Sequence, residues 1–170
     1  GDVPLTELAE LTSPSGDPSQ AARYGAQSQY VTFLVEDRTY GIDIKLVREI
    51  KQWSSTTGLP NQPIYTRGVL NLRGTIVPVH DLRARFGSGL TEATQNHVVV
   101  IAWIGMKTVG ILVDAVSDIV SVPNEEIKPV PSGNMSGDGS FVSGLVSSGD
   151  DMVALLDLNS LFPSVDDDLL

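Results

Sequence analysis

Two histidines occur in this sequence of 170 residues, and one of them, His80, stands directly before a carboxylate, Asp81. With one of the serines, these two side chains could form a hydrolytic triad, in which the histidine takes a proton from the serine hydroxyl and the aspartate orients the ring. The matching position of an internal repeat is Leu156, so a structural histidine is the better interpretation. A small β-barrel hydrolase that uses His80 and Asp81 stays open as an alternative function.

Residues that could hold a metal or a cofactor are poorly placed. The chain has no cysteine, which excludes disulfides, thiolate zinc sites and cysteine nucleophiles. His80 and His97 do not have the spacing of a metal-binding pair, and the acidic runs Asp150-Asp151 and Asp166–Asp168 are best interpreted as solvated. Neither a glycine-rich dinucleotide motif nor a P-loop occurs. We therefore expect no metal and no cofactor.

Arg73 stands at the tip of a predicted β-hairpin that spans Gly68–Leu82. Apolar runs lie on either side of Arg73 and Gly74, and a glycine suits the reversal between two strands. A guanidinium can pair with a carboxylate through two parallel hydrogen bonds, which makes arginine a good recognition residue. The competing interpretation is an exposed turn residue without a special role. Because the tip accepts either arginine or glycine, we expect Arg73→Ala to cost no more than about 1 kcal/mol of stability while weakening partner assembly.

The hairpin recurs 76 residues further along the chain, where Gly144 matches Gly68. Its tip does not recur, because Gly149 stands at the position that corresponds to Arg73. A residue that the architecture does not require twice is a candidate for function, so Arg73 is the stronger candidate of the two tips.

Glu49 is the second charged candidate, and it lies within the segment Lys45–Trp53. Apolar residues recur there at helical spacing, at Leu46, Val47, Ile50 and Trp53. This spacing predicts a helix with Glu49 on its outward or marginal face. The matching residue of the repeat, 69 positions further on, is Asp118, which keeps the charge. Glu49 and Arg73 could form an ion pair across a groove.

The formal charge is −10 and the pI is about 4.4. Nucleic acids and anionic membrane surfaces attract Lys and Arg, so this balance argues against both as partners. The chain lacks the run of about 18 apolar residues that a membrane span needs, and no secretory signal is recognisable. The default partner is another protein.

The repeat predicts a mainly β fold in two matching halves, at about residues 30–90 and 95–163, each with about five short strands. Such halves suggest a pair of small β-barrels with a binding groove between them. Val77 and Val153 match in the repeat and are expected to point into the core. Residues 1–29 are predicted to form a mobile tail, and residues 164–170 an acidic one.

Three segments together resemble the CheW family of bacterial chemotaxis: N-L-R-G-T-I-V-P-V-H-D-L-R-A-R-F at residues 71–86, Y-G-I-D-I-K-L-V-R-E-I at 40–50 and G-I-L-V-D-A-V-S-D-I at 110–119. The similarity covers about Tyr30–Phe162, with the segments in the same order. It is specific, because N-L-R-G with both hairpins is much richer than a single motif.

This resemblance implies two SH3-like five-stranded β-barrel subdomains with a few short helices. It also implies a cytoplasmic adaptor without catalysis, monomeric alone and part of larger arrays with its partners. These partners would be the regulatory domain of the histidine kinase CheA, through the barrel ends, and the cytoplasmic tip of a chemoreceptor, through the groove. The groove residues carried over from the family are Val47, Glu49, Ile50, Gly68, Arg73, Val113 and Val116. A fragment of a CheA-type kinase, whose regulatory domain shares this fold, is the other alternative.

Overall fold

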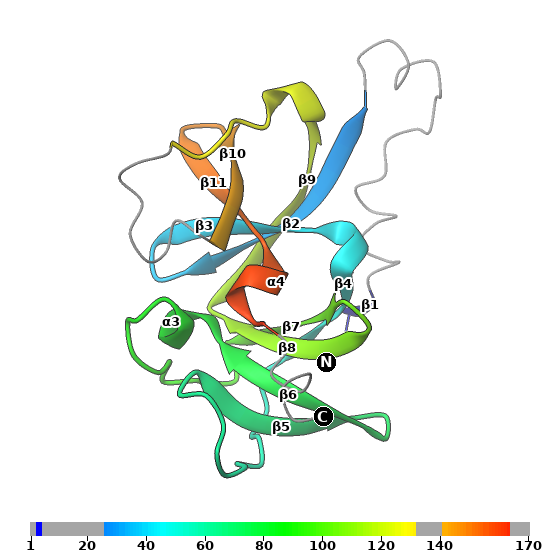
Figure 1. Ribbon diagram of the computed structural model, residues 1–170, viewed down its shortest axis with the longest axis vertical. Helices are drawn as coiled ribbons and strands as arrows, with labels where there is room; N and C mark the ends of the chain where they lie inside the picture. The colour runs from blue at the N-terminus through cyan, green and yellow to red at the C-terminus, as the bar shows by residue number, and fades with distance from the viewer. Residues whose placement is uncertain (1–2, 5–25, 132–140, 164–170) are drawn as a thin grey trace.

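The computed structural model describes residues 3–4, 26–131 and 141–163, most of which lie in strands (Figure 1). The strands are β1 (Val3–Pro4), β2 (Gln27–Val35), β3 (Arg38–Asp43), β4 (Val47–Gln52), β5 (Thr66–Leu72), β6 (Thr75–Asp81), β7 (Val98–Ile104), β8 (Lys107–Val113), β9 (Ala115–Pro123), β10 (Val142–Ser148) and β11 (Asp151–Leu156). The short helices are η1 (Ile44–Leu46), α3 (Leu82–Arg85), η2 (Asn124–Glu126) and α4 (Leu158–Leu161).

The first strand of the main body begins at Gln27, two residues before the predicted end of the tail at residue 29, and β1 lies within the predicted tail itself. The acidic tail at 164–170 and most of residues 1–29 lie outside the described residues.

The strands form two sheets, which are stacked one above the other in Figure 1. One has the order β1-β4-β7-β8-β6-β5 and the other the order β10-β11-β3-β2-β9. This arrangement confirms the mainly β fold class. Each sheet combines the first hairpin of one sequence half with the three later strands of the other half. The hairpin β7–β8 joins β4, β5 and β6, and the hairpin β2–β3 joins β9, β10 and β11.

The two sheets have the same internal plan. Replacing β4, β7, β8, β6 and β5 by their counterparts in the sequence repeat reproduces the order β9-β2-β3-β11-β10 of the second sheet. The parallel pairings correspond as well, since Val79 pairs with Gly110 in one sheet and Leu155 pairs with Gly41 in the other. The pseudo-repeat is therefore present in three dimensions, with the first hairpins exchanged between the halves.

A short bridge brings the two ends of each sheet together. Thr57, which follows β4, pairs with Val69 of β5, and Lys128, which follows β9, pairs with Leu145 of β10. In both sheets the segment that follows β4 or its counterpart β9 thus reaches the strand at the opposite end of the sheet, which is the curvature that a barrel requires.

The hydrophobic core has a part between the sheets and a part within each sheet. The central part includes Phe33 from one sheet and Ile111 from the other, together with Leu158 and Leu161 of α4, which lies between the sheets in Figure 1. Val77 and Val153 are both buried as expected, each in the separate cluster of its own sheet.

The helix predicted at Lys45–Trp53 is wrong, because the chain forms the single turn η1 and then strand β4. A β-bulge between Val47 and Glu49 explains the misleading pattern, since Arg48 is an extra residue relative to the partner strand β7. One extra residue shifts the alternation of faces, so buried Val47 and Ile50 stand three positions apart, as they would on a helix.

Gly68 is required by the bridge beside β5. Its φ is +137°, and a Cβ at this position would overlap the carbonyl oxygen of Thr57. Gly144 meets the corresponding crossing in the second sheet, where a Cβ would lie 2.8 Å from Ile127 Cγ2. Both halves thus place a glycine at this close approach, which gives Gly68 a structural role, and its role in partner binding stays a prediction.

We predict that Gly68→Ala destabilises the fold by about 2–4 kcal/mol, because the new methyl group forces the bridge strand away and the backbone is strained. Gly58→Ala is the matched control, since a Cβ there meets nothing within 4 Å, and it should change stability by less than about 1 kcal/mol. Chemical denaturation measures both. Equal stability of the two variants would show that the close approach does not constrain the fold.

Candidate partner-binding site

Glu49 and Arg73 form the ion pair that the sequence suggested. Both oxygens of the Glu49 carboxylate accept hydrogen bonds from the Arg73 guanidinium, with Nη1 lying 3.5 Å from Oε1 and Nη2 bonded to Oε2. The Glu49 side chain is only 9% exposed, whereas that of Arg73 is 64% exposed. A nearly buried carboxylate therefore holds the guanidinium of a side chain that remains largely exposed.

The turn between β5 and β6 positions Arg73 through its backbone. Arg73 and Gly74 have φ values of +51° and +89°, and the Gly74 N–H donates to Asn71 Oδ1 over 2.7 Å. A non-glycine residue in the left-handed region costs roughly 1 kcal/mol. The matching residue Gly149 has φ +63°, so the second hairpin places glycine in the conformation that this one fills with arginine.

The ion pair joins distant parts of one sheet. In the sheet order, β4 stands near one end and β5 and β6 stand at the other, so Glu49 and Arg73 meet only because the sheet curves. At the other end of β5, a cation–π contact also joins these two parts of the sheet, since the Arg67 guanidinium lies 5.3 Å from the centroid of the Trp53 ring. These contacts and the Thr57–Val69 bridge hold the two ends together.

The second sheet has no such ion pair among its described residues. Asp118 occupies the position equivalent to Glu49, but it is exposed and accepts a hydrogen bond from the N–H of Ile119 over 2.7 Å. Gly149 at the opposite tip has no side chain to offer. The acidic residue is therefore nearly buried in the sheet whose hairpin tip supplies an arginine, and exposed in the sheet whose tip has a glycine. Burial of the carboxylate and presence of its arginine partner go together.

The apolar residues carried over from the family lie in the core. Val47, Ile50 and Val113 are buried between the sheets, and Val116 is half-buried against the same cluster. Gly68 lies at the other end of β5 from the tip, beside Thr57. The structure thus brings Glu49 and Arg73 together. The three valines and Ile50 instead pack in the core, under β4 and under the junction where the chain passes from β8 of one sheet to β9 of the other.

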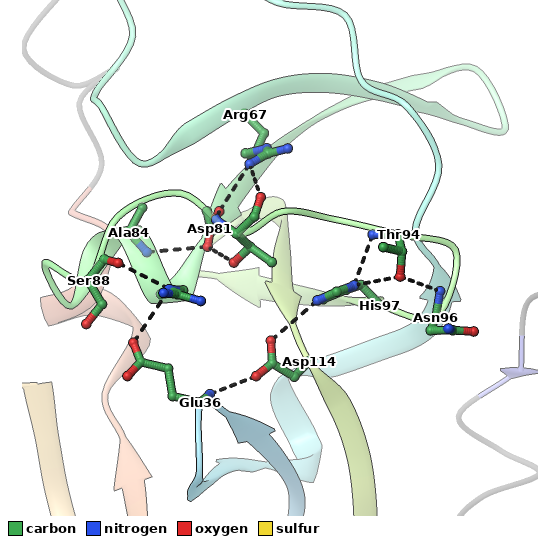
Figure 2. Close-up of polar contacts among 11 residues, drawn as sticks. Glu36, Arg67, Asp81, Ala84, Ser88, Thr94, Asn96, His97 and Asp114 are labelled. Carbon is green, nitrogen blue, oxygen red and sulfur yellow. Dashed lines mark hydrogen bonds and ion pairs between the residues drawn. The ribbon is translucent and has the colours of Figure 1, made fainter.

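Asp81 does not orient His80. The fully buried Asp81 carboxylate accepts hydrogen bonds from Thr91 N and Thr91 Oγ1, both over 2.7 Å, and from Ala84 N over 3.3 Å, and it pairs with Arg67 at 3.4 Å (Figure 2). It caps α3 in this way, as the sequence suggested. Each of its polar contacts is therefore structural.

His80 faces an aromatic environment instead. Its ring stacks on Phe162 with centroids 4.7 Å apart, meets the edge of Tyr65, and has Nδ1 3.0 Å from Thr66 Oγ1. Burial lowers the pKa of His80 from 6.5 to about 4. The ring is therefore neutral near pH 7, and the hydrolytic pair proposed from adjacency in sequence is not formed.

Sequence reasoning missed a polar network that connects the two sheets (Figure 2). Asp114, between β8 and β9, accepts the Glu36 N–H over 2.7 Å and has Oδ1 3.6 Å from His97 Nε2, while Arg83 Nε lies 3.7 Å from the Glu36 carboxylate. Three of these residues, Arg83, His97 and Asp114, line an open pocket of about 470 Å³ together with Leu90, Thr91 and Glu92. No spacing in the sequence predicts this network, because its members come from four separate segments.

The two curved sheets form a β-sheet scaffold. The Glu49–Arg73 ion pair lies where one sheet closes, and His80 forms no hydrolytic pair with Asp81. In the part of the chain that the structure describes, no group of three His, Cys, Asp or Glu residues could hold a metal ion. The same residues contain no helix long and apolar enough to cross a membrane.

Comparisons with known proteins identify the family. The family model described as "CheW-like domain" matches residues 29–166. The chain is 39% identical over 136 residues to the chemotaxis protein CheW of Rhizobium meliloti, covering 80% of this chain and 88% of that one. It is 37% identical over 136 residues to CheW of Klebsiella aerogenes, covering 80% and 82%.

A solved structure agrees with these sequence relatives. The crystal structure of the scaffolding protein TtCheW from Thermoanaerobacter tengcongensis superimposes with a TM-score of 0.74 at 32% identity, covering 83% of this chain and 91% of that one. The chain belongs to the CheW family, and it is a chemotaxis coupling adaptor.

We predict that Arg73→Ala destabilises the protein by about 1–2 kcal/mol, because it leaves the Glu49 carboxylate nearly buried without its guanidinium, and the exposure of Arg73 moderates the loss. This cost is larger than the one expected from the sequence for an exposed tip, because the sequence does not show that Glu49 is nearly buried. Alanine keeps the same backbone strain as arginine, so the change isolates the side chain.

Thermal and chemical denaturation of Arg73→Ala, Glu49→Gln and the double variant measure this coupling. Adding Glu49→Gln to Arg73→Ala should recover stability, since a neutral amide is cheaper to bury than a carboxylate. If Arg73→Ala unfolds like the parent, the carboxylate does not depend on the arginine.

The pKa of His80 predicts a pH dependence. As the pH falls from 6.5 towards 4, the unfolded chain takes up a proton on His80 that the folded chain does not, so stability declines through this window and the contribution levels off below it. His80→Leu, which introduces the residue found at the matching position Leu156, should remove a loss on the order of 3 kcal/mol. Denaturation at several pH values compares the slopes, and parallel curves for parent and variant would contradict a neutral buried ring.

Proposed function

We propose that this chain is a non-catalytic, cytoplasmic adaptor that couples the regulatory domain of the histidine kinase CheA to the cytoplasmic tip of a chemoreceptor. Family membership supports the class of partner. The observation that carries the receptor site is the Glu49–Arg73 pair, in which a buried carboxylate orients an arginine that remains 64% exposed. A fixed guanidinium loses less conformational entropy on binding than a free one.

The local energetics favour recognition as the reason for Arg73. Glycine would relieve the backbone strain of the turn, and the second hairpin uses it there. The first hairpin instead retains a strained arginine and a buried acid, which is the pattern expected where function outweighs local stability. The proposed site also includes the core residues that pack under β4 and under the junction of β8 and β9: Val47, Ile50, Val113 and Val116.

The non-catalytic assignment follows from the polar contacts around His80. The neighbouring carboxylate is fully used by Thr91, Ala84 and Arg67, and His80 lies against aromatic rings. A hydrolase needs an acid or base oriented towards a nucleophile and a substrate, and this pair lacks that orientation.

The kinase side is proposed to use the two hairpin ends. Ile76 on β6 and Met152 on β11 are 62% and 55% exposed, and they match each other in the 76-residue repeat. Exposed apolar side chains at equivalent places on both sheets suit two related protein contacts, one on each sheet. They are the residues that we assign to kinase-domain pairing.

We predict that Glu49→Lys weakens binding to a receptor tip at least tenfold and leaves binding to the kinase regulatory domain within about twofold, because the reversed charge repels Arg73 and disorders the receptor surface. The swap Glu49→Lys with Arg73→Glu should recover stability without recovering receptor binding, since the exposed charge is then negative. Calorimetric titration with each partner measures both. Receptor binding restored by the swap would show that the pair is only structural, and equal loss of both partners would contradict the division of surfaces.

We predict the converse for the hairpin ends. Ile76→Asp and Met152→Asp should each weaken association with the kinase regulatory domain by about tenfold or more while stability stays near the parental value, because a charge then enters an apolar contact. Met152→Asp, which lies in the other sheet from Arg73, should also leave receptor binding near the parental value. Ile64→Asp is the control, as Ile64 is 85% exposed and lies outside both hairpins. Unchanged kinase binding in both hairpin variants would refute this assignment.

A further inference from the structure

Strand β1 pairs with the outer edge of β4. The pairing is antiparallel and places Val3 opposite Ile50 and Pro4 opposite Glu49, while the inner edge of β4 pairs with β7 (Figure 1). A segment close to the start of the sequence therefore lies beside the residue that anchors Arg73.

The architecture does not require this strand. Strand β9 is the counterpart of β4, and it is the last strand of its sheet order, with no added strand among the described residues. An unpaired sheet edge offers a row of N–H and C=O groups to any extended segment that approaches it. The outer edge of β4 has recruited such a segment from its own chain, and the pairing extends over two residues only.

We propose that the outer edge of β4 is a docking edge for an extended strand, that β1 occupies it in cis, and that docked β1 competes with the receptor tip. The inference deepens the proposed receptor function and rests on it. An occupied edge places β1 beside Glu49 and Ile50, where a partner that contacts β4 and Arg73 has to approach. Release of β1 then exposes the receptor surface.

The small size of β1 suits a reversible competitor. A two-residue pairing contributes little stability by itself, but residues 5–25 tether it to the rest of the chain, so its docking is intramolecular. The apparent receptor affinity falls in proportion to the fraction of molecules with a free edge. A β1 that is docked about 80% of the time weakens binding about fivefold.

Two substitutions of opposite charge at one position test the proposal in the full chain. Pro4→Glu places a carboxylate opposite Glu49 and should release β1, whereas Pro4→Lys places a cation there and should retain it. Both remove the same proline. Ser15→Glu and Ser15→Lys carry the same charges outside β1 and control for the change in net charge.

Hydrogen exchange of the peptide Val47–Gln52 reports the docking edge without any partner. We expect faster exchange in Pro4→Glu than in Pro4→Lys, and no such difference between the two Ser15 variants. Titration with the receptor tip should then show Pro4→Glu binding several-fold tighter than Pro4→Lys. A synthetic peptide of residues 1–11, added in excess to Pro4→Glu, should reverse the gain.

Equal exchange in the two Pro4 variants would overturn the docking edge. Faster exchange in Pro4→Glu with unchanged or weaker receptor binding would overturn the competition, and weaker binding would make β1 a part of the receptor surface. If no variant binds the receptor tip, the coupling function proposed above fails, while the exchange experiment still decides whether β1 docks on β4.

Discussion

A nearly buried carboxylate at the closure of a curved sheet is the constraint on which the site depends. Glu49 loses most of its hydration on folding, and an unpaired charge in such a place costs several kcal/mol. The guanidinium of Arg73 offsets this cost, but only if the β5–β6 turn takes a left-handed conformation and the two ends of the sheet meet. One ion pair thus links the turn, the curvature of the sheet and the charge displayed at its surface.

The two sheets provide an internal comparison for this interpretation. They share strand order, a bulge at the equivalent positions of β4 and β9, a crossing glycine and a bridge that joins the sheet ends. They differ at the hairpin tip and at the acidic residue opposite it. A feature found in both sheets is explained by the fold, whereas the Glu49–Arg73 pair belongs to one sheet and is not required by the shared strand plan.

The parts of the fold that depend on local signals could be predicted from the sequence. The hairpin at Gly68–Leu82 follows from its alternating apolar residues and its glycine turn, and the cap at Asp81 follows from its position before α3. The Glu49–Arg73 pair could be suggested from the sequence because Arg73 stands where the repeat has Gly149. The helix at Lys45–Trp53 was wrong because a β-bulge gives buried residues a helical spacing.

Features that depend on how distant segments of the chain pair could not be predicted from the sequence. The exchange of first hairpins between the halves leaves no mark on periodicity, since each strand has the same pattern in either sheet. The network of Glu36, Asp114 and His97 joins residues from separate segments. The near burial of Glu49, and with it the stability cost of removing Arg73, follows from curvature that only the folded sheet shows.

Amide chemical-shift mapping of the isotopically labelled chain, titrated with an isolated receptor tip, tests the central claim most directly. The account predicts that the largest changes occur in β4 and at the β5–β6 turn around Arg73, while the equivalent β10–β11 turn around Gly149 stays unperturbed. Changes concentrated at the β10–β11 turn, or around His80 and Phe162, would contradict the assignment of the Glu49–Arg73 surface as the receptor site.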